Sequence, residues 1–346
     1  MKTAKGWERI LVFNVNWLGD VLFSTAAIRN IRRNFPDSFI ACIIPARCYQ
    51  VLKGNPHLDE IIIFDEKDRH KGALGLLNFA ARLRDKKFDV VFLLHRSFTR
   101  ALIARMAGIS QRIGYNVKRR GFLLTKKIPQ PHPDTMHRID YYLNIIEQAG
   151  LRAEDRYPEF FIDVKDTEYA EKFLEKNSVR KGDYLVMLNP GGNWPLKRWP
   201  KEYWAALADR LVKELNAKVV ITGSYNDRSR VDSIIGSMRE KPITACDLLN
   251  LKQLAALACK ADLFITADTG PMHIANAVGT KLIIALFGPT SPELTGPVPG
   301  RNVIIMHKDV GCKIPCYVTD CIDNRCMKAI TVDDVMERVR QAIQPG

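Results

Sequence analysis

The chain has 346 residues, of which 47% are hydrophobic and 26% are charged, and its formal net charge is +14. This composition is ordinary for a soluble globular protein, and the length predicts about two domains. Apolar runs such as residues 282–287 are too short to span a bilayer, and Asn14, Asn16 and Asp20 interrupt the first apolar run, which argues against a membrane span and a signal peptide. We therefore expect a cytoplasmic protein.

The positive charge is concentrated in the first half of the chain, because residues 1–165 carry +11 of the total. A basic half implies an anionic partner: nucleic acid, a membrane surface or a phosphorylated substrate. No recognisable DNA- or RNA-binding motif surrounds the basic residues, which weakens the case for nucleic acid. A merely solvated basic face is the alternative. The basic residues gather at Arg29, Arg32, Arg33, Arg112, Lys118, Arg119, Arg120, Lys126 and Lys127.

Short apolar segments alternate with helical patterns in the first half of the chain. They predict strands at 9–15, 39–44, 60–64 and 88–94 and helices at 21–34, 75–84, 99–107 and 136–148. Nearly continuous apolar runs are typical of parallel strands that are buried on both faces. The alternation therefore predicts a parallel sheet covered by helices.

The pattern pauses between residues 152 and 183, where charge rises, and then restarts. The second half predicts strands at 184–189, 218–222, 262–266 and 281–287 and helices at 168–176, 200–215, 228–238, 249–259, 271–278 and 331–343. We therefore predict an α/β protein with two doubly wound, Rossmann-like domains, 1–165 and 166–330, that face a central cleft. A C-terminal helix within 331–346 is expected to pack back on the first domain. In such folds ligands bind at the carboxyl ends of the strands.

The strongest candidate site follows the strand at 262–266. This strand breaks at Asp268, Thr269 and Gly270, and a helix restarts at Pro271. Proline fits the first helical turn, Asp268 or Thr269 can cap it, and glycine lets a ligand approach the backbone. Free amide groups and the helix dipole at such an N-terminus favour a phosphate. The alternative is an ordinary capped turn between a strand and a helix.

Two further glycine turns follow strands of the second half. Gly191 and Gly192 expose backbone amides near Lys197, whose charge could meet a diphosphate. Ser224 and Asp227 follow the next strand, where an acid can hold a ribose hydroxyl or simply cap a helix. Each turn is weak evidence alone. Together with the turn described above, they predict a nucleotide-diphosphate site on one rim of one domain.

A carboxylate occupies the corresponding turn of the first half. Asp20 follows Gly19 just after the first strand. At the mouth of a cleft, this side chain could act as a general base and accept a proton from an incoming hydroxyl group. Asp is also a preferred helix N-cap, and a helix N-terminus favours the ionised carboxylate and makes it a weaker base. General base and cap are both open on this pattern alone.

Four of the eight cysteines lie within fifteen residues near the C-terminus, at Cys312, Cys316, Cys321 and Cys326. Four thiols in one loop fit a structural zinc site or two disulfides. The spacings match no common zinc signature, and a cytoplasmic location disfavours disulfides. Reduced structural thiols are the favoured interpretation.

These motifs, in this order, resemble glycosyltransferase family 9, the lipopolysaccharide heptosyltransferases, over nearly the whole chain. The resemblance rests on residues 19–22, 189–192, 197–200, 222–224 and 268–275 and on the loop from Cys312 to Cys326. The chain departs from the family at Ala26, where proline is frequent, and at Tyr225, Asn226 and Asp227, which replace an acidic stretch of some members.

The resemblance implies a GT-B fold and an inverting transfer of heptose from ADP-heptose to the phosphorylated inner core of a lipid-linked lipopolysaccharide precursor. It implies that Asp20 is the general base and that Lys197 binds the donor phosphates. The other donor contacts would come from Gly191, Gly192, Ser224, Asp227, Asp268, Thr269, Gly270, Pro271, Met272 and His273. We expect Lys118, Arg119 and Arg120 to meet the acceptor at the inner face of the cytoplasmic membrane. No Asp-x-Asp pair ends a predicted strand, so we expect neither a metal requirement nor a cofactor.

Two other functions fit the same sequence. A sugar-nucleotide epimerase or hydrolase on this scaffold would consume a donor without any glycan acceptor. A non-catalytic nucleotide-sugar-binding protein would bind the donor and never turn it over. A nucleotide sugar other than ADP-heptose is a further alternative for the donor.

Overall fold

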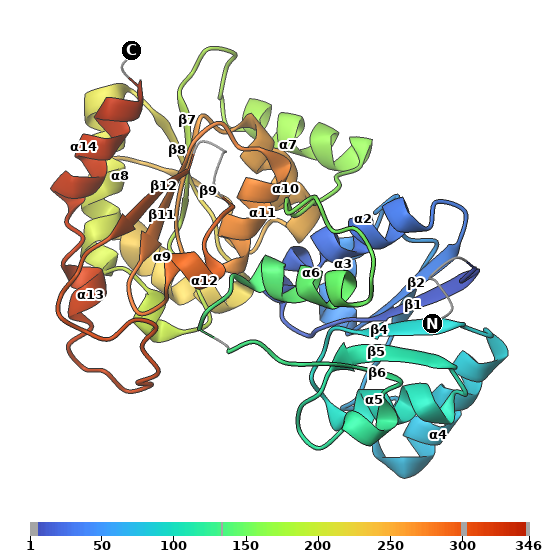
Figure 1. Cartoon of the computed structure of the whole chain (residues 1–346). Helices are drawn as coiled ribbons and strands as arrows, with labels where there is room; N and C mark the ends of the chain where they lie inside the picture. Colours follow the sequence, from blue (N-terminus) through green and yellow to red (C-terminus); the bar gives the residue numbers. More distant parts are fainter. Residues whose placement is uncertain (1–5, 133, 299–302, 344–346) are drawn as a thin grey trace. The chain divides into compact units, whose positions relative to one another are not determined.

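The computed structural model describes residues 6–132, 134–298 and 303–343. The chain forms two compact units, Met1–Phe161 and Ile162–Gly346. Each unit has one six-stranded parallel sheet between layers of helices (Figure 1). The α/β class and the two doubly wound sheets that the sequence predicted are confirmed.

The sheet of the first unit reverses its strand order near the middle. Its strands are β1 (Arg9–Phe13), β2 (Phe39–Ile44), β3 (Glu60–Ile63), β4 (Val90–Leu93), β5 (Gln111–Tyr115) and β6 (Lys126–Ile128). They pair in parallel in the order β3-β2-β1-β4-β5-β6. The loops that follow β1 and β4 therefore leave in opposite directions, which opens a place for a ligand at the carboxyl ends of these strands.

Helices cover both faces of this sheet. They are α1 (Leu18–Phe23), α2 (Thr25–Asn34), α3 (Tyr49–Leu52), α4 (Gly72–Asp85), α5 (Phe98–Met106) and α6 (Arg138–Gln148), with short 3₁₀ turns η1 (Ala46–Cys48) and η2 (Gly121–Leu123). On one face, α4 and α5 bury Phe79, Leu83 and Ala104 against Leu11 and Val91. On the other face α2 packs against α6 (Figure 1).

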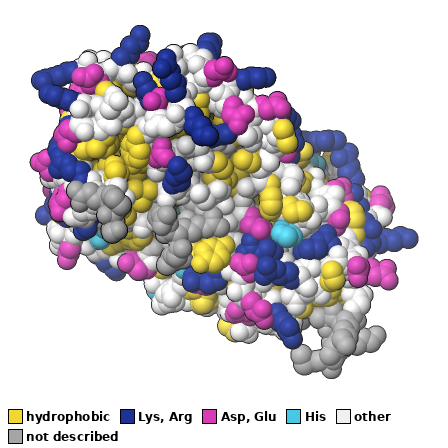
Figure 2. Space-filling model, turned by 90° about the horizontal axis from the view of Figure 1, so that it is seen from above, with side chains coloured by type: hydrophobic (Ala, Val, Ile, Leu, Met, Phe, Trp, Pro, Cys, Tyr) yellow, Lys and Arg dark blue, Asp and Glu magenta, His cyan; other side chains and the backbone are white. Residues whose placement is uncertain are grey.

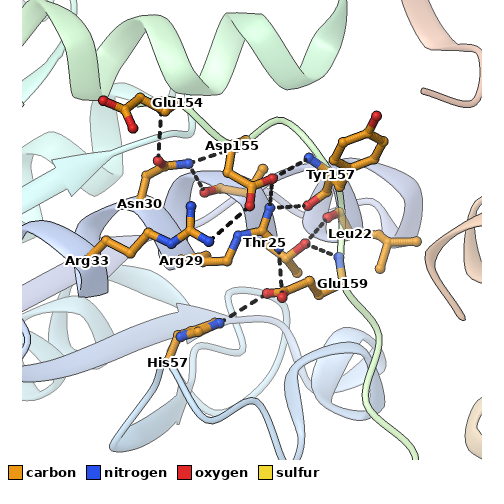
Figure 3. A network of polar contacts seen from close by, with 11 residues as sticks. Leu22, Thr25, Arg29, Asn30, Arg33, His57, Glu154, Asp155, Tyr157 and Glu159 are labelled. Carbon is orange, nitrogen blue, oxygen red and sulfur yellow. Dashed lines mark hydrogen bonds and ion pairs between the residues drawn. The ribbon is translucent and has the colours of Figure 1, made fainter. Parts of the chain in front are cut away.

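The last segment of the first unit is fastened to α2 by a polar network (Figure 3). Arg29 is 5% exposed, and its guanidinium pairs with Asp155 and, at 2.7 Å, with Glu159. Asn30 donates to the carbonyl of Asp155 at 2.8 Å, and Nε2 of His57 lies 3.2 Å from Glu159. Two carboxylates thus compensate the charge of a buried arginine and hold this segment in place.

The sheet of the second unit repeats the same arrangement. Its strands are β7 (Leu185–Asn189), β8 (Lys218–Ile221), β9 (Ile243–Thr244), β10 (Leu263–Ala267), β11 (Ile283–Phe287) and β12 (Val303–His307). They are parallel, in the order β12-β11-β10-β7-β8-β9. The reversal here lies between β10 and β7, so the loops after these two strands are the expected ligand position.

Two separate apolar cores lie on the two faces of this second sheet. The helices are α7 (Val164–Lys176), α8 (Lys201–Leu215), α9 (Arg228–Ile235), α10 (Leu251–Lys260), α11 (Gly270–Val278), α12 (Pro292–Thr295), α13 (Arg325–Lys328) and α14 (Val332–Ile343), with η3 (Pro195–Lys197) and η4 (Tyr225–Asp227). Val186 and Leu188 face α8, α9 and α14, whereas Leu185 and Met187 face α7, α10 and α11. This alternation is the period of two that a strand imposes on its side chains.

The C-terminal helix α14 corrects one expectation from the sequence. We expected it to pack back on the first domain, but its apolar residues Val335, Met336 and Val339 are fully buried in the core of the second unit, beside α8. The physical reason is its amphipathic pattern, because an apolar stripe of a helix packs on the nearest uncovered sheet face.

The strands that the sequence missed lie at the sheet margins. β6, β9 and β12 are edge strands and β5 lies next to an edge. They are short or partly exposed, so they lack the fully buried apolar run of a central strand. The sequence predicted a single helix at 21–34. The structure has two helices there, α1 and α2, which meet at Ser24.

Candidate active site

The N-terminus of α11 lies at the switch point of the second sheet. β10 ends at Ala267, Thr269 takes the N-cap position, and Pro271 occupies the first turn. The Thr269 side chain makes no capping hydrogen bond; its hydroxyl lies 3.3 Å from that of Thr266. Because no N-cap side chain covers the first amides of α11, this end of the helix is available to an anion.

The Asp268 carboxylate is the centre of a buried cluster beside this helix. Asp268 is 4% exposed, and its Oδ2 lies 2.6 Å from Lys197 Nζ and accepts a hydrogen bond from Thr290 at 2.7 Å. Nε2 of His273 lies 3.6 Å from Oδ1. Burial alone would raise the pKa of the Asp268 carboxyl, but His273 and the charge of Lys197 outweigh burial and hold this pKa well below its usual value. Asp268 is therefore ionised at neutral pH.

Lys197 is oriented by this carboxylate from within the same unit. It ends the turn η3, and its ammonium also lies 5.8 Å from the centre of the Trp194 ring. The Lys197 side chain keeps 22% exposure. An ammonium group has three donors, so Lys197 can keep its bond to Asp268 and still donate to a phosphate.

Asp227 joins the two glycine turns of the second unit. Its Oδ1 accepts from the Gly192 amide at 3.2 Å, and its Oδ2 accepts from the Ser224 amide at 3.0 Å and hydroxyl at 2.6 Å. A Cβ on Gly191 would come within 2.6 Å of this carboxylate, and Gly192 has a φ of +150°. Both glycines are therefore required by the way the loops meet, and Asp227 anchors the loops in addition to any contact with a ligand.

Asp20 lies at the switch point of the first sheet and is not a helix cap. α1 begins at Leu18, so Asp20 sits inside its first turn, and the N-cap position belongs to Trp17. Its Oδ1 accepts a hydrogen bond from the hydroxyl of Tyr142 at 2.9 Å. Tyr142 is buried, and burial together with the charge of Asp20 raises its pKa well above the usual value, so it remains a donor. The cap interpretation of Asp20 is wrong.

The three basic residues predicted to meet the acceptor are not equivalent. Lys118 and Arg119 are exposed and both have left-handed backbones, with φ of +49° and +56°. Arg120 is fully buried, and its Nε donates to the carbonyl of Tyr115 at 2.9 Å. The tight turn at 118–119 thus directs Arg120 inward.

Sequence reasoning missed two residues at this edge of the first sheet, His95 and Arg100. His95 follows β4 after one residue, and Arg100 lies in the first turn of α5. The available signal was a polar stretch, His95 to Arg100, directly after a continuous apolar strand. It resembles the polar turns that identified the other sites.

The four cysteines near the C-terminus form no disulfide and no arranged metal site among the described residues. Cys312, Cys316, Cys321 and Cys326 are all free thiols. Over the described part of the chain, no group of three or more His, Cys, Asp or Glu side chains is arranged to hold a metal ion. Within the same ranges, none of the helices combines the length and the apolar character of a membrane span.

Two doubly wound domains, each with its polar groups at a switch point, define the GT-B class of fold. The chain matches the model of the family described as "Glycosyltransferase family 9 (heptosyltransferase)" over residues 76–325. The chain belongs to this family and is a glycosyltransferase.

Individual relatives cover almost the same length. The chain is 28% identical over 314 residues to lipopolysaccharide heptosyltransferase 2 of Escherichia coli strain K12. The aligned region covers 86% of this chain and 87% of the relative. A solved family 9 glycosyltransferase from Veillonella parvula superposes with a TM-score of 0.86 at 27% identity, covering 97% and 98% of the two chains. The solved E. coli ADP-heptose heptosyltransferase II superposes with a TM-score of 0.79 at 24% identity over 96% and 98%. This last likeness shows the fold alone.

Proposed function

We propose that this glycosyltransferase moves a heptose from ADP-heptose to the inner core of a lipopolysaccharide precursor, with inversion at the anomeric carbon. The observation that carries the donor assignment is the pair formed by Lys197 and Asp268 beside the uncapped N-terminus of α11. A fixed ammonium and the open amides of a helix N-terminus suit the two negative phosphates of a nucleotide sugar. The heptose and the acceptor follow from the names of the relatives.

In the proposed mechanism the second unit stabilises the leaving group. As the bond from the sugar to the phosphate breaks, negative charge grows on the departing ADP. Lys197 and the backbone amides of Thr269 and Gly270 meet that charge as it develops, so little reorganisation is needed. Gly191 and Gly192 allow the backbone to come close to the phosphates. The contacts of Ser224, Asp227, Met272 and His273 with the donor stay predictions.

The first unit activates the acceptor. Asp20 removes the proton of the attacking hydroxyl group, which adds to the face of the sugar opposite the leaving diphosphate and inverts its configuration. The hydrogen bond from Tyr142 fixes the carboxylate for this step. Asp268 cannot take this role, because Lys197 and His273 keep its pKa well below the usual value.

The acceptor is an anionic amphiphile held at the inner face of the cytoplasmic membrane. Exposed Lys118 and Arg119, together with the excess of positive charge in residues 1–165, suit such a partner. Basic residues near an anionic surface each add about 1 kcal/mol of binding. We therefore propose a peripheral membrane location for the enzyme.

An assay of ADP release with and without acceptor separates the three candidate functions. The proposed function predicts release that depends on acceptor and forms one glycosidic product per ADP. A hydrolase would release ADP, and an epimerase would convert the donor, without acceptor. A binding protein would show saturable binding of ADP-heptose and no turnover under either condition. Either of the last two results would overturn the proposal.

A further inference from the structure

Buried arginines in the first unit fall into two kinds. Arg29 is 5% exposed, and two carboxylates, Asp155 and Glu159, meet its charge (Figure 3). Arg100 and Arg120 are 3% and 0% exposed, and among the described residues no carboxylate hydrogen-bonds to either of them. Elsewhere the surface mixes both signs of charge, as Figure 2 shows for one face. Burial without a hydrogen bond to a carboxylate therefore distinguishes this pair.

The guanidinium of Arg100 has unused donors. Its Nη2 donates to the side-chain oxygen of Asn16 at 2.7 Å, while Nε and Nη1 are buried and have no partner among the described residues. The nearest carboxylate in the same ranges is Glu66, at 3.7 Å, which is too long for a hydrogen bond. The Glu66 side chain is 50% exposed. A buried cation with unmet donors is costly, so it indicates a position that an external anion fills.

Arg120 lies beside His95, because Nη1 of Arg120 donates to the backbone carbonyl of His95. Nη2 of Arg120 is buried and has no partner within the described ranges, and a Cβ on Gly114 would approach it to 3.1 Å. Nδ1 of His95 accepts a hydrogen bond from the Ser97 amide at 3.0 Å, so the neutral ring carries its proton on Nε2. Burial and the charges of Arg100 and Arg120 lower the pKa of His95 to about 3. His95 is thus an uncharged donor at neutral pH.

These groups lie at one edge of the sheet. Asn16 follows β1, His95 follows β4, and Arg120 follows β5. β1 and β4 flank the reversal of strand order, and Asp20 lies four residues beyond Asn16. The unpaired nitrogens of Arg100 and Arg120 are all donors, and such a set selects an oxyanion over a neutral hydroxyl group or a cation.

We propose that Arg100, Arg120 and His95 form a binding site for an oxyanion of the acceptor, a phosphate monoester or a carboxylate, and that Glu66 occupies this site until the oxyanion replaces it. The assignment to the acceptor rests on the proposed function, whereas the oxyanion site itself does not. Glu66 is suited to such an exchange because its bond to Arg100 is long and its carboxylate is half-exposed. The site would hold the acceptor by its charge beside Asp20.

The test is equilibrium binding of two small anions to the full chain by calorimetry. Methyl phosphate and acetate distinguish the phosphate from the carboxylate, and saturating ADP blocks the anion site at α11. We expect Arg100→Gln to weaken binding of the preferred anion at least about tenfold, because charge-assisted hydrogen bonds are lost. We expect Glu66→Gln to tighten it several-fold, because the competing carboxylate is removed.

The control is Arg105→Gln on the same helix. Arg105 is exposed, so its loss should leave binding unchanged. The proposal is overturned if neither anion binds, if Arg100→Gln binds as the wild type does, or if Glu66→Gln fails to tighten binding. Should Arg100→Gln prove unfolded in a thermal melt, the Glu66→Gln result alone decides, since a half-exposed side chain is replaced there.

Acceptor kinetics then separate this site from the proposed function. Arg100→Lys, which keeps the charge and loses the fork of donors, should raise acceptor KM and leave donor KM unchanged. If the wild type neither binds ADP-heptose nor shows turnover that depends on acceptor, the proposed function is refuted. The result for anion binding would still stand. Anion binding with unaltered acceptor KM would refute the assignment of the site to the acceptor.

Discussion

Asp20 follows strand β1 of the first unit, and Asp268 follows strand β10 of the second. Their surroundings give the two carboxylates different chemistry. Asp268 is almost fully buried and neutralises Lys197. Its pKa lies well below the usual value, so it accepts no proton near neutral pH. Asp20 instead accepts a hydrogen bond from the neutral hydroxyl of Tyr142. Of the two, only Asp20 suits the role of a base.

Asp20→Asn should abolish transfer and leave ADP binding nearly intact. The amide has the same shape but cannot take the proton of the acceptor hydroxyl. Loss of a general base costs about a hundredfold to ten-thousandfold in rate. Turnover is measured by ADP release with acceptor present, and ADP affinity by calorimetry. Near-native turnover would show that Asp20 is not the base.

Tyr142→Phe is the matched variant for the same site. It removes the hydrogen bond and retains the buried ring. A hydrogen bond to a carboxylate favours its charged form, so the acid limb of the pH–rate profile should move to higher pH while the rate at its plateau falls less than in Asp20→Asn. An unmoved profile would mean that Tyr142 only fills space.

Lys197→Ala should weaken donor binding and slow turnover, because the ammonium meets the diphosphate in the ground state and the transition state. One charge-assisted contact is worth about 1.5–3 kcal/mol. The variant also leaves Asp268 without its cation, so a second change, Asp268→Asn, should recover stability but not activity. Recovery of activity in the double variant would show that Lys197 serves Asp268 and not the donor.

At the scale of elements, long-range polar contacts fix the loops and the segment after α6. The two glycine turns of the second unit meet through Asp227, and α2 holds the segment after α6 through Arg29. Each contact joins elements that leave different strands. Rigid loops of this kind keep the site groups in place before a ligand binds.

Arg29→Met should destabilise the chain by about 3–5 kcal/mol, because it leaves the two carboxylates without the buried cation. Arg33→Met is the control. Arg33 also pairs with Asp155, at 3.1 Å, but its side chain is 56% exposed, and an exposed pair is worth about 0–1 kcal/mol. Denaturant unfolding of both variants measures the difference. Equal midpoints would mean that the network does not hold the segment.

At the scale of the whole molecule, transfer should persist in excess EDTA. Lys197 and the α11 amides meet the charge that a divalent cation would otherwise meet. Initial rates and the melting temperature are measured before and after chelation. A rate that collapses and returns with magnesium would contradict this mechanism, and a lowered melting temperature alone would indicate a structural metal in the Cys312–Cys326 loop.

The stability of the chain should fall as pH drops below about 6.5, the ordinary value for histidine. Burial and neighbouring cations lower the pKa of His95 to about 3. Below about pH 6.5 the unfolded chain therefore binds a proton that the folded chain does not, which lowers the free energy of unfolding. The pKa values of Glu159 and Asp268 are also lowered, which adds to the loss near pH 4. Denaturant unfolding between pH 7.5 and 5 measures the first effect. The pKa of His70 is also lowered, by burial and by the charges of Arg69 and Arg82, so His95→Gln should reduce the loss without abolishing it, whereas the exposed His132→Gln should leave it unchanged.

The sequence by itself determined the class of fold and the positions of the main turns. Buried parallel strands are continuous apolar runs and helices repeat every 3.6 residues, so both are local patterns that can be counted along the chain. The turns at Asp20, Gly191 and Asp268 stood out because polar residues and glycine directly follow such runs. Strands β6, β9 and β12 escaped because an edge strand is partly exposed and its pattern is weak.

Only the tertiary structure decided which of these groups meet. The contact between Lys197 and Asp268 spans 71 residues, and that between Tyr142 and Asp20 spans 122. No local sequence pattern around one residue of such a pair indicates its partner. Arg120 likewise looks like a surface charge in the sequence, because it follows two other basic residues. The left-handed turn at Lys118 and Arg119 directs its side chain inward. A contact between distant residues depends on how sheets and loops pack. That packing makes Asp268 a fixed anion, and it buries Arg100 with its carboxylate partner, Glu66, beyond hydrogen-bond distance.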